Sequence, residues 1–347
     1  MKQHYSFMSK CFCAIFLAMI INIVSVKQAL AQTQVATLKH GDNISAFYGT
    51  NALIEAYDAA ETGDVITLSS GVYTIDSINK GITLRGAGIV TDTIAGTSST
   101  VITSNLTANI ANDDTSLTIE GVLFHANTFT AHRLTNPTFI KCYFNSFVTC
   151  NDSINPMTSS RFINCRFGSL NLESQGSVDA NFINCVIWSV TNHGTGMNVY
   201  NSYVYLDKTD FTMSAYNCIV IGHHIYNGAW WIGHVGMNSS SYAINCIGID
   251  GGLEASYKDN CWEYSSYTEV FESYTGNDIF YFTEPLFLKE EIASSCLGTD
   301  GKQVGIYGGM SPYSARPYYM TIKRCTVGER TTDDGHLSVD IEVVTEQ

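Results

Sequence analysis

The segment from Gly222 to His234 holds the residues whose types are best suited to binding chemistry. It reads GHHIYNGAWWIGH and combines histidines, a tyrosine and two adjacent tryptophans. Sugar rings pack on flat aromatic side chains and exchange hydrogen bonds with polar groups around them. The segment is therefore a candidate glycan-binding loop, with two aspartates shortly before it. The candidate residues are His223, His224, Tyr226, Trp230, Trp231, His234, Asp207 and Asp210.

The same composition allows a second interpretation, in which the loop is structural. Trp230 and Trp231 would then fold back and pack on the body of the protein, while the histidines would simply face solvent. The sequence leaves both interpretations open.

A second aromatic segment, Asp250 to Glu284, mixes aromatic residues with glutamates in an irregular order. It is too aromatic to be disordered. We expect it to pack as a flap against the side of the protein and to wall a groove beside the tryptophan loop. Its acidic residues could hold calcium but match no calcium-binding motif, and no CxxC or HxxxH spacing points to zinc. The sequence therefore predicts no metal or cofactor site.

A repeated element fills the middle of the chain and must position these segments. RFINCRF (Arg161 to Phe167) returns as NFINCVI (Asn181 to Ile187), and looser copies lie on both sides, at intervals of 16 to 28 residues. A unit of about 20 residues cannot bury its own apolar face, so consecutive units must stack. The cysteine position of the seven copies is occupied by Gly121, Cys142, Cys165, Cys185, Ser202, Cys218 and Cys246.

Stacking assigns a role to each position of the repeat. Phe162, Cys165 and Phe167 are predicted to point into the core and to form columns with their counterparts. The asparagine is predicted to lie at a bend between strands, because it tolerates a left-handed backbone and its amide can bond to the next asparagine of the column. This column comprises Asn164, Asn184, Asn201, Asn217 and Asn245.

The cysteines of the repeat are interpreted as free thiols that are buried like small apolar residues. Neighbouring strands lie about 4.8 Å apart, farther than the about 3.8 Å between the Cβ atoms of a disulfide. The alternative is that some of them form disulfide bridges in an oxidising compartment.

The segments on either side of the repeat carry a family resemblance. Ala52 to Gly88, ALIEAYDAAETGDVITLSSGVYTIDSINKGITLRGAG, resembles the opening of right-handed parallel β-helix proteins of the pectin-lyase-like type. Ser294 to Gly309, SSCLGTDGKQVGIYGG, is similar to the last coil of such proteins. The resemblance implies an all-β fold, a single-stranded right-handed parallel β-helix solenoid of about ten coils. A helix over Asn51 to Ala60 would cap its N-terminal end.

The catalytic motifs of enzymes with this fold are not matched. The lyases resemble one another in carboxylates that hold calcium and in an Arg or Lys base, and the hydrolases use close aspartates. Trp231-Ile232-Gly233-His234 has Gly233 where the lyases have aspartate, and Gly222-His223-His224 matches the hydrolase motif only in part. Basic residues that could serve as a lyase base are few, namely Arg133, Lys141, Arg161, Arg166, Lys208 and Lys258.

Charge and the N-terminus indicate an exported acidic protein. Of 347 residues, 18 are Lys or Arg and 32 are Asp or Glu, a formal net charge of −14 that disfavours nucleic acid, anionic membranes and polyuronates. Lys2 and Lys10 precede an apolar run from Cys11 to Val26, and Ala29-Leu30-Ala31 supplies the small residues of a cleavage site. This pattern predicts a signal peptide, residues 1–31, cleaved after Ala31. An uncleaved anchor is the alternative, but the run is short for a membrane span of about 20 residues.

The chain is thus divided into a signal peptide, a β-helix over residues 32–311 and an extension over residues 312–347. In the extension, an alternation of apolar and polar residues follows a TTDDG turn, which predicts a β-hairpin with one apolar face. A lone hairpin is marginal in water, so this face could mediate self-association. The apolar positions are Leu337, Val339, Ile341 and Val343.

The function expected from these observations is non-catalytic glycan binding or adhesion by a secreted, cell-surface or periplasmic protein. Two alternatives remain, because a fold of this kind hosts unrelated activities. One is a polysaccharide lyase or glycoside hydrolase, and the other is a structural surface or assembly protein.

Overall fold

A computed structural model describes residues 34–345, apart from 92–97, 111–115, 150–155, 173–176, 193–194, 207–211, 228–229, 238, 274–285, 315–319 and 332–336. The signal peptide expected over residues 1–31 lies outside this range. Within it, no helix is long and apolar enough to cross a membrane.

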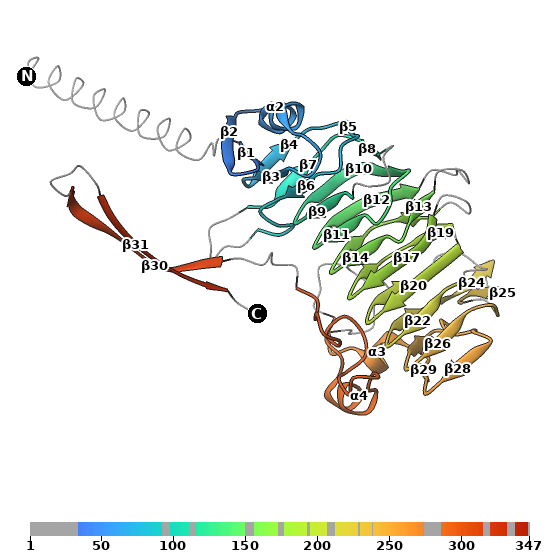
Figure 1. The fold of residues 1–347 in the computed structure, drawn as a ribbon. Coiled ribbons are helices and arrows are strands. Elements are labelled where there is room, and N and C mark those ends of the chain that lie inside the picture. Colours follow the sequence, from blue (N-terminus) through green and yellow to red (C-terminus); the bar gives the residue numbers. More distant parts are fainter. Residues whose placement is uncertain are drawn as a thin grey trace, which may run out of the picture.

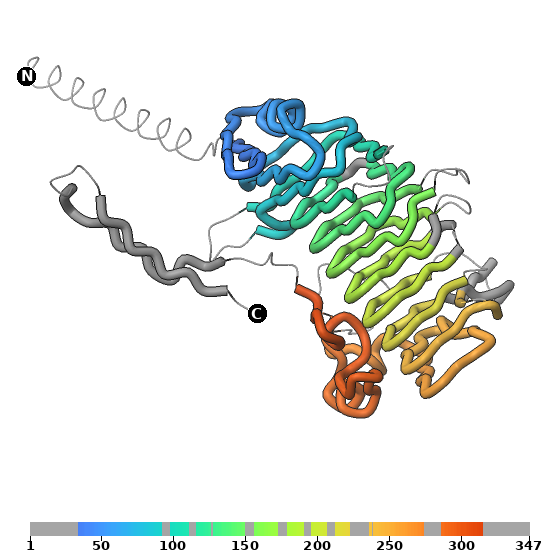
Figure 2. The backbone as a smooth tube through the Cα atoms, in the orientation of Figure 1, coloured from blue at the N-terminus to red at the C-terminus, as the bar shows by residue number. Residues whose placement is uncertain are grey.

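Two long sheets of short parallel strands run along the molecule, and successive coils contribute one strand to each (Figure 1). The tube in Figure 2 shows these coils stacked along one axis. In the first sheet the parallel strands are, in spatial order, β3 (Val65–Leu68), β6 (Thr83–Arg85), β9 (Thr118–Glu120), β11 (Thr138–Ile140), β14 (Arg161–Ile163), β17 (Ser177–Ile183), β20 (Thr195–Tyr200), β22 (Ser214–Tyr216), β26 (Tyr242–Ile244) and β28 (Tyr257–Asp259).

The second sheet keeps the same order of coils. Its main strands are β4 (Gly71–Tyr73), β7 (Thr100–Ile102), β10 (Leu123–His132), β12 (Tyr143–Thr149), β15 (Arg166–Phe167), β18 (Val186–Ile187), β21 (Tyr203–Tyr205), β23 (Ile219–Ile221), β27 (Ile247–Ile249) and β29 (Trp262–Tyr264). Shorter strands pair beside these two rows, namely β5 (Ser77–Ile78), β8 (Leu106–Asn109), β13 (Met157–Thr158), β16 (Leu170–Asn171) and β19 (Val190–Asn192).

The core between the sheets is built from the columns that the repeat predicts. Phe162 pairs in register with Phe139 on one side and Phe182 on the other. Its ring lies 4.9 Å from the ring of Phe139 and 4.7 Å from that of Phe182, nearly parallel to both. Phe162, Cys165 and Phe167 are fully buried. The prediction of inward-facing columns is confirmed.

The bend of each coil has the backbone that the asparagines predict. All five asparagines of the column have φ between 46° and 55°, in the left-handed region. The amide of Asn245 donates to the Oδ1 atom of Asn217 at 3.4 Å, as predicted for neighbouring coils. The prediction does not hold along the whole column, because the Asn184 amide donates to backbone carbonyls instead and the Asn164 side chain has no hydrogen-bond partner among the described residues. Asn260, with φ of 49°, continues the column by donating to Asn245 at 2.6 Å. An eighth copy of the motif, Asn260-Cys261, was thus missed in the sequence.

The cysteines beside these bends are free thiols. Cys142, Cys165, Cys185, Cys218 and Cys246 are buried and unbridged, whereas Cys261 in the last coil is partly exposed. The Cys165 thiol donates to the carbonyl of Phe139 in the preceding coil at 3.4 Å, and Cys185 does the same to Phe162. The interpretation as buried, unbridged thiols is confirmed for these residues.

The N-terminal end carries a helix and two antiparallel strands. Helix α2 (Ala52–Ala59) forms within the predicted range Asn51 to Ala60 and buries Leu53 and Tyr57, while the Asn51 side chain makes no capping hydrogen bond. Strand β1 (Val35–His40) pairs antiparallel with both β3 and β2 (Asn43–Tyr48). These two strands were not predicted.

The C-terminal residues 286–314, here called the strap, lie against the outer face of the second sheet. That face is apolar: Ile219, Ile221, Ile247 and Ile249 are buried, and they form one cluster with strap residues such as Val304. The Tyr203 hydroxyl donates to the carbonyl of Leu286 at 2.7 Å. Strands that are apolar on both faces need a second covering layer. The strap, which includes α4 (Glu290–Ser295), supplies this layer together with the preceding helix α3 (Tyr267–Val270).

The structure corrects one expectation for this region. Ser294 to Gly309 resembles a last coil but contributes no strand to either long sheet. Its chain runs back along the bends of earlier coils: the Asn184 amide donates to the carbonyls of Ile306 at 2.9 Å and Gly308 at 2.8 Å. Beyond it, β30 (Met320–Thr331) and β31 (Leu337–Thr345) pair as the antiparallel hairpin that was predicted.

Candidate functional site

The tryptophan segment forms a hairpin that leaves the stack between two consecutive coils. Strand β24 (His223–Asn227) pairs antiparallel with β25 (Trp230–Val235), and both lie in the connection from β23 to β26. The register places His224 opposite His234 and Tyr226 opposite Trp231. Six candidate residues thus share one element, while Asp207 and Asp210 lie outside the described residues. The glycan-binding role of all eight stays a prediction.

Close backbone packing anchors the base of this hairpin. Gly222 donates its backbone N–H to Ile249 at 2.9 Å, and Met237 donates to Gly252 at 3.0 Å. A Cβ atom on Gly236 would collide with the carbonyl oxygen of Gly251, so glycine is required for this approach. The base of the hairpin is therefore anchored on the loop at Gly251 and Gly252, which begins the last coil.

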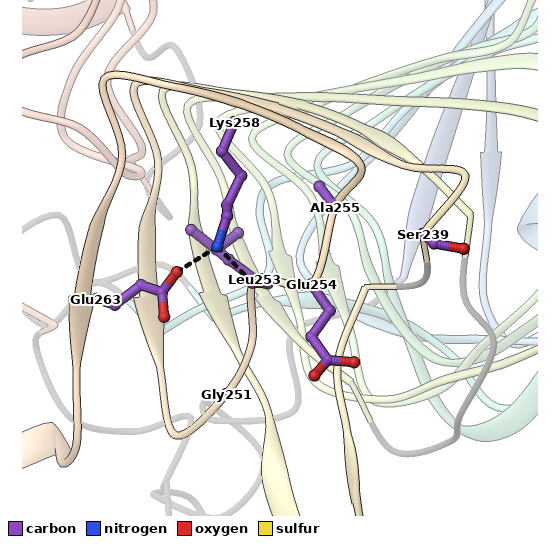
Figure 3. Close-up of a pocket in the computed structure, with 7 residues that line it drawn as sticks. All are labelled: Ser239, Gly251, Leu253, Glu254, Ala255, Lys258 and Glu263. Atoms are coloured by element: carbon purple, nitrogen blue, oxygen red, sulfur yellow. Dashed lines mark hydrogen bonds and ion pairs between the residues drawn. The ribbon is translucent and has the colours of Figure 1, made fainter.

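That loop lines an open depression of about 600 Å³ (Figure 3). Ser239, just after the hairpin, and Glu254 lie at its rim, and Lys258 and Glu263 lie across from them. The lining residues are Ser239, Gly251, Leu253, Glu254, Ala255, Lys258 and Glu263.

Lys258 and Glu263 occupy core positions of the last coil. Lys258 is in register with Ala243, the preceding member of the inner column of the first sheet. Glu263 is in register with Gly248, at the same point of the second sheet. The Lys258 ammonium lies 2.6 Å from a Glu263 carboxylate oxygen, with the two side chains 41% and 57% exposed. A solvated ion pair therefore ends both apolar columns and forms one side of the depression.

Leu253 completes the floor beneath this pair. A Cβ atom on Gly248 would lie 2.8 Å from the Cγ atom of Leu253, so Leu253 fills the space that a side chain would take. The Lys258 ammonium also donates to the carbonyl of Leu253 at 3.4 Å. The depression thus offers an apolar floor, a cation, two carboxylates and a hydroxyl.

The remaining basic candidates are dispersed. Arg161 is exposed on the first sheet, whereas the Arg166 guanidinium packs 5.0 Å from the Tyr313 ring of the strap. Lys141 takes the bend position of its coil, where burial lowers its pKa to about 8 and the Glu120 carboxylate acts in the opposite direction. Lys208 lies outside the described residues, and of the other five only Lys258 lines the depression.

The described part of the chain holds no group of three or more His, Cys, Asp or Glu side chains placed to bind a metal ion.

The structure partly corrects the predicted flap, Asp250 to Glu284. Tyr257, Trp262 and Tyr264 belong to strands of the last coil, because the chain makes one more turn before it leaves the stack. Residues 274–285 of that segment lie outside the described range.

The comparisons with known proteins found no matching family model, no matching curated protein and no matching solved structure.

Proposed function

We propose that the chain is an exported, non-catalytic glycan-binding protein, built on a right-handed parallel β-helix of the pectin-lyase-like type with an N-terminal capping helix. The tryptophan hairpin and the depression at its base form one binding site. The solenoid acts as a rigid support, and the mature chain after Ala31 resides outside the cytoplasm, secreted or at the cell surface or periplasm.

The observation that carries this proposal is the anchoring of the hairpin beside the depression. Gly236 and Met237 contact the loop at Gly251 and Gly252, and the same loop lines the depression. Aromatic residues in the hairpin and polar groups in the depression supply the two kinds of contact that sugars need. The shared loop supports this combination, because it anchors the base of the hairpin beside the depression.

Charge favours particular glycans. Glu254 and Glu263 outnumber Lys258 at the depression, and the whole chain carries a net charge of −14. A polyuronate would be repelled. The ligand is therefore a neutral or amino-bearing glycan.

Binding assays of the purified mature protein, residues 32–347, with neutral, amino-bearing and acidic polysaccharides test this proposal. Neutral or amino-bearing glycans bind, and Trp230→Ala and Trp231→Ala reduce the affinity at least tenfold. Tyr242→Ala, which removes a 53% exposed ring from the first sheet, is the matched control and leaves binding unchanged. Equal binding by all three variants would contradict the assignment of the site.

A second candidate function is cleavage of the bound glycan. Lys258, Glu254 and Glu263 line one depression, and a carboxylate with a base is what a lyase or hydrolase requires. The same samples distinguish the two functions, because unsaturated or reducing ends accumulate only if the protein is an enzyme. If the wild type produced new polysaccharide chain ends and Lys258→Met did not, a catalytic function would replace the binding proposal.

A further inference from the structure

The outer face of the first sheet carries an apolar stripe. Ile163 pairs in register with Ile140 and Ile183, and the column continues through two tyrosines whose rings stack 5.1 Å apart. Each member is partly exposed. The stripe consists of Ile140, Ile163, Ile183, Tyr200, Tyr216 and Ile244.

Charged residues bound this stripe at both ends. Glu120, which precedes Ile140 in the column, lies 3.5 Å from the Arg85 guanidinium, and exposed Asp259 follows Ile244. Six coils spaced by about 4.8 Å give the stripe a length of about 24 Å. A continuous apolar surface of this kind marks a contact site.

The two sheets differ in how their outer faces are covered. On the second sheet, Ile219 and Ile247 are fully buried beneath the strap. On the first sheet, the stripe stays partly exposed in the described part of the chain. A second covering element on the first sheet would bury this stripe.

The C-terminal hairpin has the pattern of such an element. Its register pairs Ile322 with Val343, Cys325 with Ile341 and Val327 with Val339. Directly opposed residues of an antiparallel pair share one face, so these pairs define an apolar face. The pairs Arg324–Glu342 and Thr326–Asp340 belong to the other face.

Length and chain connection fit the hairpin to the stripe. Leu337 to Val343, the apolar positions of β31, span about 20 Å at about 3.4 Å per residue. Tyr313 packs on Arg166, three residues after Ile163 in the same coil. The six residue steps from Ser314 to Met320 can span about 20 Å, which is enough to bring the hairpin from this bend onto the stripe.

We propose that the hairpin β30–β31 of the chain docks its apolar face on the stripe of the same molecule. The strap then covers the second sheet and the hairpin covers the first, and the chain passes from one sheet to the other near Tyr313. This intramolecular contact is distinct from the glycan site and does not depend on it.

Disulfide trapping tests the contact, since native Cys325 lies in the middle of the hairpin's apolar face by register. The full mature chain receives Ile163→Cys, Ile183→Cys or Ile244→Cys, one at a time. Val72→Cys, at a 52% exposed position of the second sheet, is the control. After mild oxidation, peptide mapping identifies the bonds, and gels separate intrachain from interchain products.

The proposal predicts an intrachain bond from Cys325 to at least one stripe position and none in the Val72→Cys control. Ile341→Asp abolishes the bond, whereas Asp340→Ala, on the opposite face, does not. An interchain bond would assign the stripe to the hairpin of a second copy and overturn the intramolecular contact. The absence of any bond at all three stripe positions would overturn the docking itself.

Discussion

The Lys258 ammonium and the Glu263 carboxylate meet at 2.6 Å where the two inner columns of the core end. Every earlier coil from Ile119 and Phe124 onward places an apolar residue or glycine at these two positions. The exposed edge of a sheet invites another strand to pair with it, and inward-pointing charges prevent this. We interpret the pair as the element that ends the stack.

The first prediction follows from this role. Replacing both residues by valine leaves an apolar end on which another copy can stack, so the variant associates end to end. Sedimentation velocity over a range of concentrations measures the association. The charge-swapped variant, Lys258→Glu with Glu263→Lys, retains the pair and stays like the wild type. A double-valine variant with unchanged mass would contradict the interpretation.

Asn184 provides a test of how the strap is held. Its amide donates to Ile306 and Gly308, so Asn184→Ala leaves two carbonyls without this donor, at a cost of about 1–3 kcal/mol. Alanine also strains the left-handed backbone, at φ of 50°. Asn184→Gly loses the same hydrogen bonds without that strain.

Both variants are expected to increase proteolysis within residues 296–314, and Asn184→Ala is expected to be the less stable to urea. If the strap were as resistant to protease in Asn184→Gly as in the wild type, the amide would not be what holds it.

The cysteine column predicts slow thiol chemistry. Burial raises the pKa of Cys142, Cys165 and Cys246, and the hydrogen bond with Cys246, followed by burial, raises that of Cys261. Since the thiolate is the reactive form, these residues resist iodoacetamide at pH 8 in the folded protein and react after unfolding in urea. Mass spectrometry locates the adducts, and rapid labelling of Cys165 in the folded protein would contradict its burial.

Burial of Lys141 makes the stability of the protein depend on pH. Its pKa of about 8 in the folded protein lies below the about 10.4 of an unfolded lysine. Between these values the unfolded chain binds more protons, so this residue makes stability rise as the pH rises from about 8 to about 10.4. Below this pH range, the folded protein bears the full free-energy cost of burying the Lys141 charge.

Urea midpoints at pH 7.5, 9 and 10.5 measure this rise, which Lys141→Met is expected to flatten. Lys39→Met, at an exposed position, retains it. The same slope in wild type and Lys141→Met would show that another group causes it.

Parts of the fold that repeat could be predicted from the sequence. Phe162, Cys165 and Asn164 return at matched positions, and stacking converts such a repeat directly into columns. The last copy, Asn260-Cys261, was missed because Lys258 and Asp259 replace the apolar residues that precede the other asparagines. Those polar residues are present because this coil ends the stack. The signal that could have found it was the Asn-Cys pair itself.

Parts that occur once were harder to predict. Gly298 and Gly305 in the strap suggest turns, but turns alone do not tell a coil from a covering segment. The depression combines Ser239, Glu254 and Lys258 from separate stretches of the chain, so no local pattern indicates it. The hairpin of Trp230 and Trp231 was recognised from composition, whereas its anchoring by Gly236 required the structure.

The central claim is that the tryptophan hairpin and the depression bind one glycan together. Calorimetric titration of residues 32–347 with the best neutral or amino-bearing polysaccharide measures it most directly, using the wild type, Trp230→Ala, Glu254→Gln and the control Tyr242→Ala. The account predicts that Trp230→Ala and Glu254→Gln each weaken binding, while Tyr242→Ala binds like the wild type. Wild-type affinity in both Trp230→Ala and Glu254→Gln would contradict it.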